Sequence, residues 1–237
     1  ALFIEKPMGQ NIREAEEIST LCKEKNIILA VNYMRRWENK YKVIKKIIDI
    51  NEFGVLQSIT AYGCTALLTS ASHLIDLFLF YGGTVEWLIG SLQNNYIRKV
   101  HGIDDPGGFA FVKFKNGVFG FLKGVSDNPN NYMFEIDLLF SNGRITSSSD
   151  GEVLKIKKFV DNKNSSGQGY KTLEKMSLKK YKVRNNERMV DALSDLIECI
   201  EQKKLPKSNP DNALEVHKLI KWVKISSLND NKKIVYN

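Results

Sequence analysis

The sequence predicts an α+β protein, in which a large, mostly antiparallel sheet with helices on one face follows the last βαβ unit of a doubly wound parallel sheet. Three observations predict this class. Residues 1–31 have the pattern of strand, helix and strand, which is the length of one βαβ unit. Residues 85–160 hold a series of β-type runs separated by turn dipeptides. Two amphipathic helical patterns then close the chain.

The N-terminal residues form the predicted βαβ unit. Residues 1–4 are apolar and predict a buried strand. Asn11 and Glu14 have the spacing of a capping box, and apolar residues recur at helical intervals over 11–25, which predicts an amphipathic helix. Residues 27–31 are apolar without interruption, as in strands that are buried on both faces of a parallel sheet. We expect the crossover between the two strands to be right-handed.

Three further elements are predicted before the large sheet. Helical periodicity predicts a helix over 38–50, and an alternating pattern predicts a strand over 55–61. The polar run Thr69-Ser70-Ala71-Ser72 can cap a helix that carries residues 73–78. Gly82-Gly83 then ends this helix, because glycine accepts the backbone conformation that follows a helical C-terminus.

The β-type runs predict a large antiparallel sheet that is largely a meander. Three connections are Asn-Gly or Asp-Gly pairs, which are the strongest short-range signal for a β-hairpin. These pairs are Asn116-Gly117, Asn142-Gly143 and Asp150-Gly151. The predicted strands cover residues 85–92, 109–115, 118–126, 132–140, 144–148 and 152–160.

The C-terminal residues have the pattern of a loop followed by two helices. Residues 161–172 are polar and predict a loop. A helix over 187–203 gathers its apolar residues on one face. The second helix begins at Asn209-Pro210, which supply an N-cap and a proline in the first turn. Residues 234–236 predict a short last strand.

The charge of the chain raises the question of nucleic acid as a partner. The net charge is +8 and the isoelectric point is about 9.2. Lysines and arginines are interleaved with acidic residues, however, and the tightest cluster, residues 171–184, has only Tyr170 and Tyr181 as aromatic neighbours. We therefore expect a solvated basic surface and no binding of nucleic acid.

Cysteine usage and hydropathy point to a cytoplasmic protein without a metal. Cys22, Cys64 and Cys199 are far apart, which argues against a disulfide framework or a zinc site and favours a reducing cytoplasm. No signal peptide is visible. The longest apolar run, around residues 74–81, is interrupted by Asp76 and is too short to span a bilayer, so we expect no membrane partner.

A few polar residues are candidates for chemistry. Lys6 follows the first strand, where open α/β sheets place their ligands; the alternative is a lysine that only covers the strand end. His73 lies in the first turn of its helix, where the helix dipole disfavours imidazolium, so the neutral ring could accept a proton or be structural. Asp76 could orient His73 or bond to nearby backbone. Arg35-Arg36-Trp37 could hold an anionic or polyhydroxylated ligand or belong to an ordinary surface.

The order of these pieces resembles one family. Glu5-Lys6-Pro7 ends a strand, Asn32-Tyr33-Met34-Arg35-Arg36-Trp37 ends the next strand, and Ser70-Ala71-Ser72-His73-Leu74-Ile75-Asp76-Leu77 begins a helix. A large antiparallel sheet closed by helices follows. Each motif is common by itself, but their order and spacing resemble the Gfo/Idh/MocA oxidoreductases, the family of glucose–fructose oxidoreductase and inositol dehydrogenase.

The resemblance implies both an architecture and a reaction. Family members have an N-terminal Rossmann domain that binds NAD or NADP and a C-terminal domain that holds a sugar, a cyclitol or a nucleotide sugar. By this resemblance, residues 1–34 are the C-terminal remnant of the dinucleotide-binding domain, and residues 35–237 are the substrate-binding and oligomerisation domain. The resemblance makes His73 and Lys6 the catalytic residues. The other implied site residues are Glu5, Lys6 and Pro7 for the cofactor, and Tyr33, Arg36, Trp37 and Asp76 for the substrate.

Two features depart from the family pattern. Many members carry an Asp four residues before the catalytic His, and Thr69 takes that position here. A subgroup of sugar-nucleotide enzymes also lacks this Asp and has a small polar run before the His, which Ser70-Ala71-Ser72 resembles. The chain also holds no G-x-G-x-x-G turn for pyrophosphate. We expect NAD(P)-dependent oxidoreductase activity of the full-length protein and poor cofactor binding by this chain alone. The alternative is a non-catalytic, truncated or degenerate relative that serves as a binding or assembly module.

The predicted sheet also suggests a protein partner. Residues 109–114 and 118–122 are aromatic or aliphatic at most positions on both faces of their strands. One face can pack on helices, and the other would stay in water unless another subunit covered it. We therefore expect a homodimer or tetramer that forms through the open face of the sheet, as is common in the family.

Overall fold

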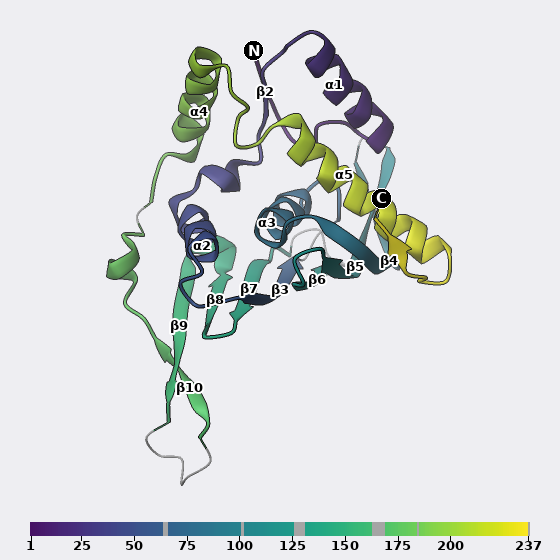
Figure 1. Cartoon of the computed structure of the whole chain (residues 1–237). Helices are drawn as coiled ribbons and strands as arrows, with labels where there is room; N and C mark the ends of the chain where they lie inside the picture. Colours follow the sequence, from purple (N-terminus) through teal and green to yellow (C-terminus); the bar gives the residue numbers. More distant parts are fainter. Residues whose placement is uncertain (64–65, 101, 126–130, 163–168, 184, 237) are drawn as a thin grey trace.

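The computed structural model of the chain contains two sheets and the helices that surround them (Figure 1). It describes all residues except 64–65, 101, 126–130, 163–168, 184 and 237. Cys64, the end of the strand predicted over 118–126 and the middle of the loop predicted over 161–172 therefore lie outside the described residues.

Most helices and strands lie where the sequence predicts them. The helices are α1 (Ile12–Glu24), α2 (Asn39–Asp49), α3 (Ser72–Gly82), α4 (Arg188–Gln202) and α5 (Pro210–Leu228), with short 3-10 helices η1 (Met34–Trp37), η2 (Ser149–Gly151) and η3 (Leu178–Tyr181). The strands are β1 (Leu2–Ile4), β2 (Leu29–Val31), β3 (Leu56–Gly63), β4 (Val85–Val100), β5 (Ile103–Phe114), β6 (Phe119–Gly124), β7 (Phe134–Phe140), β8 (Gly143–Ser148), β9 (Val153–Asp161), β10 (Lys171–Lys175) and β11 (Ile234–Val235).

The predicted βαβ unit is present at the N-terminus. Strands β1 and β2 pair in parallel, with Leu2 opposite Leu29, and α1 connects them. The Asn11 side chain accepts a hydrogen bond from the Glu14 backbone N–H at 3.1 Å, as the capping spacing predicted. The Glu14 carboxylate bonds back to the N–H of Gln10 at 2.9 Å, one residue before the cap. The unit is a separate two-stranded sheet, and the predicted domain boundary at residues 34 and 35 stays a prediction.

The large sheet has nine strands in the order β10-β9-β8-β7-β3-β6-β5-β4-β11. The three predicted hairpins join β5 to β6, β7 to β8 and β8 to β9, and all three pairs are antiparallel. The sheet is therefore two meanders, with β3 inserted between them. Strand β3 is parallel to β6 and antiparallel to β7, so it joins the two meanders into one sheet.

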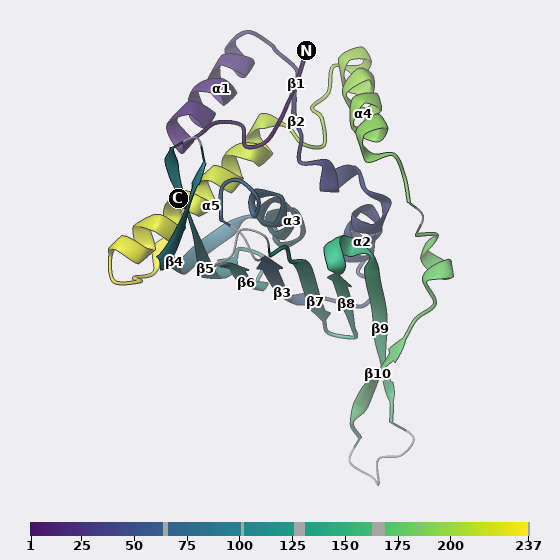
Figure 2. The same ribbon diagram turned by 180° about the vertical axis from the view of Figure 1, so that it is seen from behind.

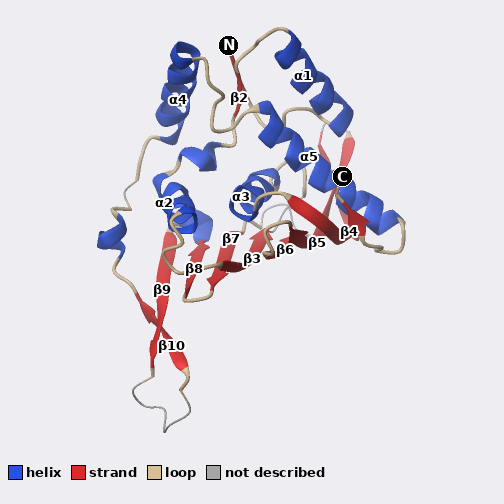
Figure 3. Cartoon of the chain, in the orientation of Figure 1, coloured by secondary structure: helices blue, strands red, loops and turns tan. Residues whose placement is uncertain are grey.

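Helices α2, α3 and α5 lie on one face of the large sheet, as both views of the ribbon show (Figures 1 and 2). Helix α3 packs closely on the middle of the sheet. The rings of Phe78 and Phe114 lie 5.2 Å apart, and a Cβ added to Gly120 on β6 would lie 2.3 Å from the Phe78 ring. A side chain at Gly120 would therefore separate the helix from the sheet. The other face of the sheet carries no helix among the described residues (Figure 3).

Three local features differ from the sequence analysis. The N-cap of α3 is Ala71 and receives no side-chain bond, so the predicted Ser/Thr cap does not form. Part of the predicted polar loop, from Lys171, is strand β10, which pairs with β9. The apolar face predicted for residues 187–203 exists on α4. Its member Leu196 is buried, but most of the face is exposed, with fractions of 40 to 59% for Met189, Val190, Leu193, Ile197 and Ile200. Among the described residues, no helix is both long and apolar enough to cross a membrane.

Candidate functional site

The end of strand β1 meets the loop before helix α3. The Lys6 ammonium is half-buried and donates a hydrogen bond to the backbone carbonyl of Thr69. The Ser72 hydroxyl donates to the same carbonyl at 3.2 Å. Since Ser72 is the first residue of α3 and His73 follows it, this one carbonyl links the strand-end lysine to the turn that carries His73. The two residues predicted to be catalytic are thus brought to one place, although they are far apart in the sequence.

Burial changes the ionisation of Lys6. Desolvation lowers the pKa of the Lys6 ammonium, and Glu5 and Asp105 oppose this shift while Arg98 adds to it. The Glu5 carboxylate accepts a hydrogen bond at 2.8 Å from the Asn32 side-chain amide, so the ends of β1 and β2 are tied together. The peptide bond between Lys6 and Pro7 is cis.

His73 is neutral and poorly solvated. Its ring is 9% exposed, and its Nδ1 is buried without a hydrogen-bond partner among the described residues. Burial lowers the pKa of His73 to about 3, and the positive charges of Lys6, Arg35 and Arg188 add to this shift. The helix dipole was the predicted cause of the neutral ring; in the structure, desolvation is the largest cause. A neutral imidazole can accept a proton, as the predicted role requires.

Arg36 and Asp76 form a buried ion pair between η1 and α3. The Asp76 side chain is fully buried and accepts three hydrogen bonds from the Arg36 guanidinium, at 2.8 to 3.0 Å. The guanidinium also donates to the Lys207 carbonyl at 2.9 Å and lies 4.6 Å from the Phe80 ring centroid. The Asp76 carboxylate therefore orients Arg36 rather than His73. The substrate-binding role predicted for Arg36 and Asp76 stays a prediction.

Tyr33 and Trp37 lie at the two ends of η1: Tyr33 is the residue before its first turn, and Trp37 is its last residue. The Tyr33 ring makes an edge-to-face contact with His73, with ring centroids 5.8 Å apart. Tyr33 is fully buried and Trp37 is 1% exposed. The Trp37 carbonyl accepts a hydrogen bond from the Asn186 side chain at 2.8 Å, which joins η1 to the segment before α4. Their predicted contacts with a substrate also stay a prediction.

Asp105 was not among the predicted site residues. This residue lies on β5 and is 5% exposed. Its carboxylate accepts hydrogen bonds from the backbone N–H groups of Leu68 and Thr69, both at 2.9 Å, and from the Thr69 hydroxyl at 2.7 Å. Asp105 therefore fixes the loop whose carbonyl receives Lys6. The family resemblance expected an Asp at the position of Thr69. Asp105, on strand β5, places a carboxylate next to that position.

A charged cluster behind His73 was also missed. Arg35 is 4% exposed and bonds to Glu38 at 2.9 Å, while Arg188 bonds to the same carboxylate at 2.7 Å. Arg35 also pairs with Asp150. Arg35 and Arg36 are buried, so they are not the ordinary surface pair that was the alternative to a ligand-binding role. Nothing local in the sequence shows that Glu38, Asp150 and Arg188 converge on Arg35. Within the described ranges, no group of three or more His, Cys, Asp or Glu residues is placed to hold a metal ion.

The two buried histidines make the stability of the fold depend on pH. An exposed histidine titrates near 6.5, whereas burial lowers the pKa of His73 to about 3 and that of His217 to about 4. Below pH 6.5 the unfolded chain binds more protons than the folded chain, so stability falls as the pH decreases. We expect the free energy of unfolding to fall by about 2 kcal/mol for each of the two histidines between pH 7 and pH 5, as measured by urea denaturation. His217→Gln should remove its share of this loss, and equal stability at the two pH values would contradict the account.

Known structures share the architecture. Levoglucosan dehydrogenase in complex with NADH and L-sorbose superimposes with a TM-score of 0.76 at 14% identity, over 99% of this chain and 73% of that one. The WlbA dehydrogenase from Bordetella pertussis, in complex with NADH and UDP-GlcNAcA, has a TM-score of 0.76 at 17% identity, over 99% of this chain and 72% of that one. The chain therefore has the fold of the Gfo/Idh/MocA-type NAD(P) oxidoreductases, as its sequence predicted.

Sequence comparison adds three relatives, whereas no family model matches the chain. An uncharacterized protein of Haemophilus influenzae is 30% identical over 99 residues, which are 40% of this chain and 95% of that protein. The NAD(+)-dependent scyllo-inositol 2-dehydrogenase of Bacillus subtilis is 22% identical over 164 residues, or 61% of this chain and 47% of the enzyme. The NADP(+)-dependent enzyme IolW of the same organism is 37% identical over 61 residues, or 26% of this chain and 16% of the enzyme. The chain thus spans about half or less of each inositol dehydrogenase.

Proposed function

We propose that this chain is the substrate-binding part of an NAD(P)-dependent oxidoreductase that moves a hydride between the nicotinamide and an alcohol of a sugar, cyclitol or nucleotide sugar. The observation that carries the proposal is the junction at the Thr69 carbonyl. There the half-buried Lys6 ammonium and the hydroxyl of Ser72, the residue before His73, bond to one carbonyl. Burial lowers the pKa of both Lys6 and His73, and the charge of Lys6 adds to the shift of His73. Perturbed ionisable groups that converge in this way are typical of active sites.

The ends of β1 and β2 fit a nicotinamide nucleotide. Open α/β sheets bind such ligands at the carboxyl ends of their strands, which here carry Glu5, Lys6 and Asn32. The Asn32 side-chain oxygen is buried without a hydrogen-bond partner among the described residues, so it offers an acceptor at this edge. Glu5, Lys6 and Pro7 would hold the nicotinamide end. When bound, the nicotinamide supplies the acceptor or donor of the hydride.

The chain's own residues handle the proton and the developing charge. In the direction of alcohol oxidation, His73 takes the hydroxyl proton onto its neutral imidazole while the hydride leaves the carbon. The Lys6 ammonium stabilises the partial negative charge that grows on the oxygen. Asp105 keeps the Thr69 loop in place, so that Lys6 holds one position. In the reverse direction the imidazolium returns the proton to the carbonyl oxygen.

Binding of the cofactor tests the proposal. We expect the full-length gene product to bind NADH or NADPH with micromolar affinity and this chain alone to bind either one far more weakly, since it holds no Gly-rich phosphate turn. Cofactor fluorescence during a titration measures both. The proposal fails if the full-length product binds neither nucleotide. Micromolar binding by this chain alone would contradict only the expectation that the cofactor needs the Gly-rich phosphate turn of the full-length protein.

A second copy of the chain is the proposed partner of the open sheet face. Phe109, Phe111, Phe119 and Phe121 point away from the helices, with exposed fractions of 37 to 45%. The rings of Phe111 and Phe119 are stacked 5.7 Å apart, so they present a flat apolar surface. An exposed surface of this kind favours association.

Cys22 and Cys199 are buried and unpaired, which supports the predicted cytoplasmic location.

Light scattering tests the assembly. We expect a mass of two or four times 27.0 kDa at micromolar concentration. Phe111→Glu should reduce the mass to that of one chain, because it places a charge in the centre of the apolar surface. Val55→Glu, at another exposed apolar position, is the control and should keep the wild-type mass. A monomeric wild-type chain would refute the proposed assembly.

A further inference from the structure

Helix α4 carries two adjacent apolar stripes, and only one of them is covered. Ala192, Leu196 and Cys199 recur at helical intervals and are buried. Beside them runs the exposed stripe, which consists of Met189, Val190, Leu193, Ile197 and Ile200. A single exposed apolar residue is normal on a protein surface, whereas a row of large ones along a helix is typical of a contact surface. The apolar surface of α4 is therefore wider than the described elements that cover it.

The two-stranded sheet beside α4 has one occupied edge and one free edge. The Val31 N–H, on the outer side of β2, donates a hydrogen bond to the Ser208 carbonyl at 2.9 Å. On the other side, the Leu2 N–H and the Ile4 carbonyl bond to the backbone at the two ends of β2, both at 2.8 Å. Since the backbone groups of successive strand residues point to opposite edges, those of Phe3 point away from β2. Among the described residues, no strand pairs with that edge of β1.

Helices α1 and α4 lie on opposite sides of the β1–β2 pair, as both views of the ribbon show (Figures 1 and 2). The Asn32 side-chain amide donates a hydrogen bond to the Met189 sulfur at 3.7 Å, which places the start of α4 at the end of β2. Leu2 on β1 and Leu21 on α1 are also about half exposed, with fractions of 49% and 51%. All three layers thus leave large apolar side chains uncovered. Because parallel sheets are normally covered by helices on both faces, this arrangement fits a sheet that continues beyond β1.

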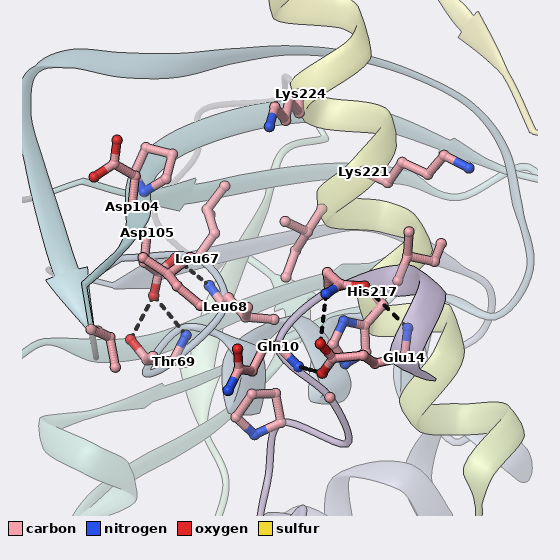
Figure 4. A pocket seen from close by; sticks show the side chains of 18 of the residues that line it. Gln10, Glu14, Leu67, Leu68, Thr69, Asp104, Asp105, His217, Lys221 and Lys224 are labelled. Atoms are coloured by element: carbon pink, nitrogen blue, oxygen red, sulfur yellow. Dashed lines mark hydrogen bonds between the residues drawn. The ribbon is translucent and has the colours of Figure 1, made fainter. Parts of the chain in front are cut away.

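This surface is separate from the pocket beside Lys6. That pocket lies between the start of α1, the loop before α3, the β4–β5 hairpin and α5 (Figure 4). Lys6, Pro7 and Thr69 line it, so it belongs to the proposed active site. Neither α4 nor Leu2 nor Leu21 contributes to its lining. The exposed stripe is therefore not explained by the binding of a substrate in that pocket.

We propose that the free edge of β1 and the exposed stripe of α4 form the docking surface for the α/β part of the full-length protein that carries the nicotinamide nucleotide. This part adds a parallel strand to β1, and its apolar side chains cover the exposed stripe. The two solved structures described above extend beyond the residues that superimpose on this chain, which covers 73% and 72% of them. The inference rests on the proposed function, since that function requires a nucleotide-binding part.

Thiol labelling tests whether the exposed stripe is covered. Leu193→Cys places a thiol in the middle of the stripe, where the native side chain is 47% exposed. We expect it to react with a maleimide at least about tenfold more slowly in the full-length protein than in this chain alone, because the thiol is reached only through local opening. Val55→Cys, at an exposed position between α2 and β3, is the control and should react at the same rate in both proteins. Mass spectrometry of peptides identifies the labelled residue, so the native cysteines are counted separately.

Amide hydrogen exchange tests the edge of β1. The Phe3 amide points to the free edge, and the Ile4 amide points to β2 by the same alternation. In this chain alone, Phe3 should exchange at least about tenfold faster than Ile4, since only Ile4 is hydrogen-bonded. In the full-length protein both amides should exchange slowly, because an added strand accepts a bond from Phe3.

The outcomes separate this inference from the proposed function. Equal labelling of Leu193→Cys in both proteins, or equally fast exchange of Phe3 in both, overturns the docking surface. Slow labelling of Leu193→Cys in this chain alone would show that a second copy covers the stripe, which also overturns it. A full-length protein that protects Leu193→Cys and Phe3 but binds neither NADH nor NADPH would support the docking and contradict the proposed function.

Discussion

Asp76→Ala is expected to lower the free energy of unfolding by about 3–5 kcal/mol, the cost of leaving a buried charge without its partner. The Arg36 guanidinium is 6% exposed and loses three hydrogen bonds when the carboxylate is removed. Among the described residues, the bond to the Lys207 carbonyl and the contact with the Phe80 ring remain. Because the pair joins η1 to α3, the variant also loosens the connection between the βαβ unit and the helix that carries His73. Urea denaturation followed by circular dichroism measures the change.

A matched control separates burial from pairing. Asp137→Ala removes the carboxylate of another bidentate arginine pair, with Arg144 on the sheet, but the Arg144 side chain is 43% exposed and that of Asp137 is 24% exposed. We expect this variant to cost at most about 1 kcal/mol, as for solvated pairs. Replacing both buried partners, with Arg36→Met and Asp76→Leu, should recover part of the loss, since no unpaired charge remains. An effect of Asp76→Ala as small as that of the control would show that the pair is not buried in solution.

On the proposed function, His73→Ala is expected to lower kcat of the full-length protein by about 10²–10⁴-fold, the usual contribution of a general base. Burial keeps the imidazole neutral, and no carboxylate of the described residues bonds to it, so the ring is free to accept the proton. The Michaelis constant should change little, because the proton is transferred only in the transition state. His217→Ala is the control: it also removes a buried histidine, but one on α5 for which no hydrogen bond with Lys6, Thr69 or Ser72 is present among the described residues.

Local patterns predicted most of the fold. The hairpin pairs at 116–117, 142–143 and 150–151 determine which strands are neighbours, because a two-residue turn leaves the chain no other pairing. The place of β3 could not be predicted, since its partners β6 and β7 come far later in the chain and no turn connects it to either. The apolar face of α4 shows a different limit. Helical periodicity identifies which residues share a face, but it does not say whether another element covers that face.

The candidate site was predictable where a residue follows a strand or begins a helix. Lys6 and His73 are such residues. Lys6 bonds to the Thr69 carbonyl, and so does the hydroxyl of Ser72, the residue before His73. Asp105 was not predictable, because its role depends on the β4–β5 hairpin extending beyond the predicted strands, so that the carboxylate reaches a loop 36 residues earlier in the chain. The contacts of Arg36 with Asp76 likewise depend on tertiary packing alone.

Turnover of the full-length protein tests the central claim most directly. The absorbance of the reduced nicotinamide is followed with NAD or NADP and a panel of scyllo-inositol, levoglucosan and UDP-sugars, for the wild type, His73→Ala and His217→Ala. The account predicts alcohol-dependent reduction of the nicotinamide by the wild type and by His217→Ala, and a loss of about 10²-fold or more in His73→Ala. Unchanged turnover in His73→Ala would contradict it.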